Sequence, residues 1–84
     1  MKKLYTSQNG YVEVFQDDAG TMYLVALCGG IAWSHAGIIM NDQERADFLA
    51  NSSSVDAVAR RMCYDFDPFK DRPVPEHLRS QMLA

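Results

Sequence analysis

Short runs of apolar and β-branched residues, separated by turn signals, fill the first half of the chain. Such runs predict β-strands, because successive side chains of a strand point to opposite faces of the sheet. The predicted strands cover residues 2–6, 11–16, 21–28 and 31–40. Strands this short, joined by short turns, predict a four-stranded antiparallel β-meander.

Turn signals follow the first three of these strands. Asn9-Gly10 supplies the φ > 0 residues that a tight hairpin needs, and Gly29-Gly30 is a second hairpin signal of this kind. Between them, residues 17–20 contain two aspartates and a glycine that turn the chain. We therefore expect consecutive strands to pair with one another.

The second strand has two unlike faces. Val12 and Val14 share one face, and Tyr11, Glu13 and Phe15 share the other. If helices cover one side of the sheet, the other side can stay open, and an exposed apolar face usually marks an interface. Tyr11 and Phe15 are therefore candidate partner-binding residues.

Two helix starts follow the strands. Asn41 and Glu44 have the spacing of a capping box, which predicts a helix that runs to about Ala50. Ser53 and Asp56 repeat that spacing and predict the start of a second helix.

The second helix has one apolar stripe, at positions i, i+3, i+4, i+7 and i+11. Its members are Val55, Val58, Ala59, Met62 and Phe66. We expect the helix to end before Pro68, because the residue that precedes a proline avoids the αR region. Residues 65–75 then form a Pro-rich loop, and Pro75 can open a short third helix.

The predicted fold is α+β, with the antiparallel meander followed by two helices packed on one face. With 84 residues, of which 48% are hydrophobic and 23% charged, residues 1–84 make one small domain with a thin core. Small domains often gain stability by pairing, so a homodimer stays open as an alternative.

The net charge and the distribution of charged residues indicate which classes of partner the protein can bind. A net charge of −3 argues against nucleic-acid binding, which needs clustered lysine and arginine. No charged residue lies between Asp18 and Asp42, and a run of that length could cross a bilayer. Gly29-Gly30 and the polar side chains in the run favour a sheet instead, so we expect no membrane partner.

The two cysteines, Cys28 and Cys63, lie far apart and lack the spacing of a zinc knuckle or a disulfide framework. We expect free, buried thiols. Residues 5–10 are too polar to continue a signal peptide from Lys2 and Lys3. These two observations favour a cytoplasmic location.

Candidate catalytic and metal-binding residues fail on geometry. Ser34 and His35 are adjacent on a predicted strand and point to opposite faces, so they cannot act as a nucleophile and its base. An acidic loop matches several positions of the calcium-loop template: Asp65, Asp67, Asp71 and Glu76. Lys70 stands where that template needs a glycine. We expect no enzyme activity, metal or cofactor.

Aromatic and guanidinium groups gather near the end of the second helix and along the Pro-rich loop. Such side chains are enriched in binding hot spots. The candidate partner-binding residues here are Arg60, Arg61, Tyr64, Phe69 and Arg72. In a thin core, Phe66 and Phe69 could instead serve to close the interior.

These residues favour a protein that binds another macromolecule, with a protein as the favoured partner, as an inhibitor, immunity factor or accessory subunit. One alternative is a small-molecule-binding or enzymatic homodimer with a pocket near Trp33 and His35. The other alternative is a structural homo-oligomer that assembles through the sheet.

Overall fold

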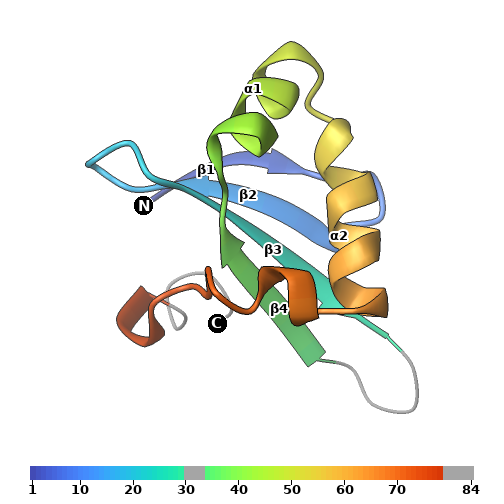
Figure 1. The fold of residues 1–84 in the computed structure, drawn as a ribbon. Helices are drawn as coiled ribbons and strands as arrows, with labels where there is room; N and C mark the ends of the chain where they lie inside the picture. Colours follow the sequence, from blue (N-terminus) through green and yellow to red (C-terminus); the bar gives the residue numbers. More distant parts are fainter. Residues whose placement is uncertain (30–33, 79–84) are drawn as a thin grey trace.

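The computed structural model describes residues 1–29 and 34–78. Four strands form one antiparallel sheet in the order β1 (Lys2–Thr6), β2 (Val12–Gln16), β3 (Met22–Cys28) and β4 (Ser34–Ile39). Helices α1 (Asp42–Ala50) and α2 (Ser54–Tyr64) and a single 3₁₀ turn, η1 (Asp67–Phe69), follow the sheet (Figure 1). The predicted α+β meander is confirmed.

The first two hairpins use the same turn. The amide of Gly10 donates to the carbonyl of Ser7 at 2.9 Å, and the amide of Gly20 donates to the carbonyl of Asp17 at 3.1 Å. Within these two turns only the glycine has positive φ, 79° at Gly10 and 91° at Gly20. The prediction that Asn9 would share the left-handed region is wrong, because one left-handed glycine at the end of the turn suffices to start the next strand. The predicted turn at Gly29-Gly30 extends outside the described residues.

One face of the sheet is covered by the helices and carries the main core. Val14, Leu24 and Ile38 lie at its centre and are fully buried. Val55, Ala59 and Met62 of α2 pack onto them, together with Phe48 of α1 and Phe69 of η1. The apolar stripe predicted for α2 is therefore the surface that meets the sheet, although the helix ends at Tyr64 rather than next to Pro68.

The second face of the sheet is partly covered by the C-terminal segment. Phe15, Tyr23 and Val25 form a smaller buried cluster with Val74, and Leu78 packs against it. The expectation that this face stays open is therefore wrong. Phe15 is buried, so it is not available as a partner-binding residue on a free surface.

The C-terminal segment reaches that face by passing around the outer edge of β4. The amide of Ile39 donates to the carbonyl of Arg72 at 2.8 Å, and the amide of Val74 donates to the carbonyl of Gly37 at 3.4 Å. Pro73 forms an isolated bridge with Ile38 between them. We call residues 72–74 the edge strap. At Gly37 and Ile39 it fills hydrogen-bonding positions that an edge strand leaves unpaired. Residues 76–78 are helical, at the position of the predicted third helix, and residues 79–84 lie outside the described part of the chain.

The two predicted helix starts have different outcomes. Asn41 and Glu44 form the complete capping box, in which the Asn41 side chain accepts from the Glu44 amide at 2.8 Å and the Glu44 carboxylate accepts from the Asn41 amide at 3.0 Å. Ser53 makes no side-chain cap. Its hydroxyl donates to Asn51, and the hydroxyl of Tyr5 donates to the Asp56 carboxylate at 3.1 Å, so both predicted partners are engaged elsewhere.

A disulfide joins Cys28, at the end of β3, to Cys63, in the last turn of α2. The prediction of free thiols is wrong, because the sheet and helix bring the two Cα atoms to 5.3 Å although the residues are 35 apart in sequence. The inference of a reducing cytoplasm from free thiols therefore loses its basis. Within residues 1–29 and 34–78, no helix has the length and apolar character needed to cross a membrane.

Candidate interaction surface

The outward side of α2 is basic and aromatic near its C-terminal end. Arg60, Arg61 and Tyr64 are exposed there, because Ala59 and Met62 take the positions that face the sheet. Tyr64 is 93% exposed, more than the other exposed large apolar residues of the described chain. All three residues are therefore exposed on the side of α2 that faces away from the sheet, and their partner-binding role stays a prediction.

A hollow of about 390 Å³ lies between this end of α2 and η1. We call it the Phe69 hollow, after the aromatic ring that forms part of its lining. Its lining residues are Arg60, Arg61, Tyr64, Asp65, Pro68 and Phe69. The chain makes this hollow because it leaves α2 at Asp65 in an extended conformation and turns back at η1. Phe69 itself is buried, so it offers the hollow a ring surface and is not an exposed contact residue.

The two arginines of the hollow lack acidic partners within the described part of the chain. The guanidinium of Arg61 lies 5.7 Å from the centroid of the Phe69 ring. Neither Arg60 nor Arg61 forms an ion pair with a described residue. The Asp65 carboxylate, which also lines the hollow, accepts a hydrogen bond from the amide of Asp67 at 3.1 Å. The guanidinium groups therefore keep donors for an external acceptor.

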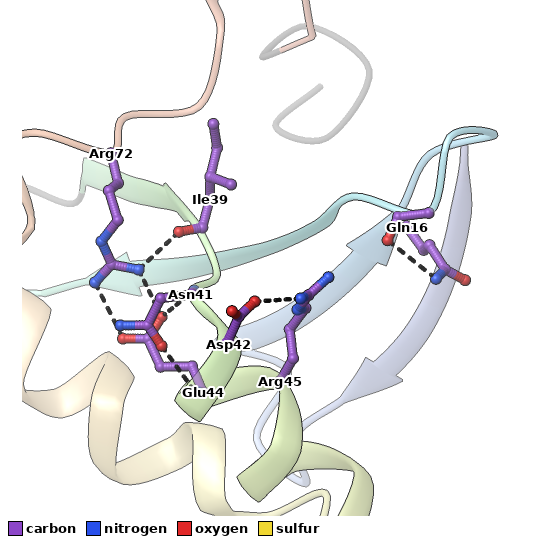
Figure 2. Close-up of polar contacts among 8 residues, drawn as sticks. Gln16, Ile39, Asn41, Asp42, Glu44, Arg45 and Arg72 are labelled. Carbon is purple, nitrogen blue, oxygen red and sulfur yellow. Dashed lines mark hydrogen bonds and ion pairs between the residues drawn. The ribbon is translucent and has the colours of Figure 1, made fainter.

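Arg72 has a structural role, unlike the two arginines of α2. Its guanidinium donates to both carboxylate oxygens of Glu44, at 2.7 and 3.1 Å, and to the carbonyl of Ile39 at 2.8 Å (Figure 2). These bonds tie the edge strap to the start of α1 and to the end of β4. The predicted partner-binding role of Arg72 therefore has no support, because its donors are used inside the protein.

Burial and hydrogen bonding have opposite effects on the pKa of Glu44. Burial favours the neutral carboxyl and tends to raise its pKa, whereas the bonds from Arg72 and from the Asn41 amide favour the carboxylate. The charges of Arg72 and Arg61 add to the second effect, and the pKa of Glu44 lies below its usual value. Glu44 is therefore a carboxylate at neutral pH, held by Arg72.

A second hollow lies on the other side of α2. It measures about 630 Å³ and we call it the turn groove, because the turn after β1 forms one of its walls. Its lining residues are Ser7, Gln8, Asn9, Val12, Ala26, Leu27, Asp56, Ala59, Arg60 and Cys63. Ala26 and Ala59 leave this space open, since small side chains meet where α2 crosses the sheet. Arg60 lines both hollows, so the C-terminal half of α2 is a ridge between them.

The remaining candidate residues lie elsewhere. Tyr11 is partly exposed just before β2, where its carbonyl accepts from the amide of Leu27 at 2.8 Å. His35 is exposed on β4 and lines neither hollow, and Trp33 lies outside the described residues. Among residues 1–29 and 34–78, no three histidine, cysteine or acidic side chains gather as metal ligands would.

Comparison of the chain with protein-family models, with curated proteins and with solved structures gives no match. The geometry of the two hollows is therefore the main guide to function. The sequence predicts arginines and a tyrosine at this end of α2, where they line the Phe69 hollow, but it does not indicate the turn groove. The one local sign of this groove is a small residue, Ala59, in the apolar stripe of α2. Its counterpart Ala26 lies on β3, and the sequence does not show that the two alanines come close.

Proposed function

We propose that this protein binds another protein, as an inhibitor, immunity factor or accessory subunit, and that it is not an enzyme. The observation that carries the proposal is Tyr64, almost fully exposed on the ridge between two hollows and flanked by Arg60 and Arg61. Tyrosine and arginine are the side chains that most often dominate protein interfaces. A partner that covers the ridge would bury the tyrosine ring and satisfy both guanidinium groups.

The sheet gives less support to assembly of identical copies through its edges. The edge strap already occupies the outer side of β4 from Gly37 to Ile39. The other edge strand, β1, has exposed Lys2 and Lys3 and a bulge before Tyr5. Lysines and bulges on an edge strand oppose pairing with a further chain. The ridge of α2 is therefore the better candidate for an interface.

The test compares proteins captured from the native lysate by three affinity-tagged forms of the chain. Tyr64→Ser removes the ring from the ridge, and Leu49→Ser is the matched control, because Leu49 is 76% exposed on α1. We expect one protein to be captured in constant proportion by wild type and Leu49→Ser, and to be lost with Tyr64→Ser. Capture that is the same with all three forms, or absent from all three, would contradict the proposal.

A further inference from the structure

We infer that the partner presents an acidic segment with one aliphatic or aromatic side chain, and that this side chain enters the Phe69 hollow. The inference rests on the proposed function and adds the chemistry of the partner. It follows from the apolar lining of the hollow, the charge at its rim and the internal use of the nearby carboxylates.

The floor and sides of the hollow are suited to an apolar side chain. The rings of Tyr64, Pro68 and Phe69 contribute to its lining, and its volume of about 390 Å³ lies within the range of pockets that hold small ligands. Pro68 stands at the start of η1, where its ring fixes the backbone. The pocket is therefore preformed, which lowers the entropic cost of filling it.

The rim of the hollow is suited to carboxylates. Arg60 and Arg61 reach it from adjacent positions on α2, and neither is paired with an acidic side chain within the described residues. The guanidinium of Arg61 lies 5.7 Å from the centroid of the Phe69 ring, within the distance of a cation–π interaction, and it donates no hydrogen bond to a described residue. An acceptor with two oxygens in one plane, as in aspartate or glutamate, matches such a donor.

Within residues 1–29 and 34–78, no carboxylate forms an ion pair with Arg60 or Arg61, although the charge of Arg61 contributes to the lowered pKa of Glu44. Asp65 accepts from the amide of Asp67, and Glu44 is bound by Arg72. A long polyanion such as a nucleic acid fits less well, because the chain has a net charge of −3 and the rim has only two arginines. A short acidic stretch around one apolar side chain can pair with the two arginines at the rim. It is short enough to avoid electrostatic repulsion from the negative charges on the rest of the protein surface.

The probe is a synthetic peptide, capped at both ends, in which one phenylalanine stands between two pairs of glutamates. Two comparison peptides carry lysine in place of each glutamate, or glycine in place of the phenylalanine. Each is titrated into isotope-labelled protein, and the backbone amide shifts are followed by nuclear magnetic resonance. We expect the acidic phenylalanine peptide to shift the amides of residues 60–69 and the two comparison peptides to bind at least about tenfold more weakly.

The protein variants separate this inference from the proposed function. The double variant Arg60→Glu, Arg61→Glu should weaken binding of the acidic peptide, and Arg45→Glu on α1 should leave it unchanged. Equal binding of the lysine peptide, absence of binding, or shifts confined to other residues would overturn the inference. Capture of a partner that still depends on Tyr64 would then leave the proposed function standing. Peptide binding without such capture would contradict the proposed function, and only the binding chemistry of the Phe69 hollow would remain.

Discussion

Cys28 and Cys63 connect β3 to the last turn of α2 by a disulfide, close to the residues that form the proposed interface. Cys63 lines the turn groove, one helical turn from Arg60. The bond therefore fixes the ridge of α2 against the sheet at its C-terminal end, while Met62 anchors the same turn in the core.

Removal of this bond should lower stability. The cross-link spans 35 residues, and a loop of that length restricts the unfolded chain enough to stabilise the fold by about 4 kcal/mol. We expect the Cys28→Ser, Cys63→Ser variant, and wild type in dithiothreitol, to unfold at similar and much lower urea concentrations than the oxidised protein. Two thiols that react in denaturant without reductant would show that the disulfide is absent.

Loss of the Arg72 guanidinium should destabilise the protein, because Glu44 would keep a largely buried charge without its main partner. The Glu44 side chain is only 12% exposed. We expect Arg72→Met to lower the free energy of unfolding by about 2 kcal/mol. Arg45→Met is the control, because its ion pair with Asp42 is exposed to solvent and should contribute at most about 0.5 kcal/mol. Urea unfolding measures both, and equal effects would contradict the structural role of Arg72.

Stability should fall at acid pH in a way that depends on Glu44. The pKa of Glu44 is lower in the folded protein than in the unfolded chain. Its contribution to the free energy of unfolding is therefore complete at pH values above the unfolded pKa of about 4.3. That contribution disappears as the pH falls through the lower, folded pKa. Asp17 also contributes stability that is lost at acid pH, because its pKa is lowered in the folded protein. The largest cause of that lowering is the hydrogen bond that the hydroxyl of Tyr23 donates to its carboxylate.

The measurement is urea unfolding between neutral pH and pH 2. We expect the free energy of unfolding of wild type to fall more steeply below about pH 4.5 than that of Glu44→Gln, which cannot titrate at this position. Parallel curves for the two proteins would mean that Glu44 has the same pKa in the folded and unfolded states.

A methyl group at position 37 should disturb the edge strap. A Cβ on Gly37 would lie 2.8 Å from Cγ2 of Val74, which is too close without movement of the strap. We expect Gly37→Ala to cost about 1–3 kcal/mol, as overpacking does in other cores. Val74→Ala removes the clashing atom, so the double variant should be less destabilised than the sum of the two single variants. Simple additivity would indicate that Val74 does not cover Gly37.

The sequence was sufficient for most features that depend on near neighbours, although the predicted cap at Ser53 and the positive φ at Asn9 are absent. The strands, the Asn41–Glu44 capping box and the apolar stripe of α2 follow from local periodicity and spacing. The disulfide and the edge strap join residues that are far apart in the chain, and no local pattern reports such distances. Phe15 was placed on an uncovered face for that reason, because nothing near it indicates that Val74 returns to the same face.

The same distinction applies to the candidate interface. The positions of Arg60, Arg61 and Tyr64 follow from helical periodicity once the buried stripe is known. The different roles of Arg72 and Phe69 depend on Glu44 and on the core, which the chain brings together only after it folds. The sequence could therefore indicate that aromatic and arginine residues gather in this segment. It could not indicate which of them are exposed and which are used inside the protein.

Site-specific photo-cross-linking tests the proposed interface most directly. A benzophenone amino acid is placed at position 64 in one form of the protein and at position 49, where Leu49 is 76% exposed, in another, and both are irradiated in the native lysate. We predict one discrete protein adduct at position 64, lost when Arg60 and Arg61 are changed to glutamate, and no such adduct at position 49. The absence of an adduct at position 64, or the same adducts at both positions, would contradict the assignment of the α2 ridge as a protein-binding surface.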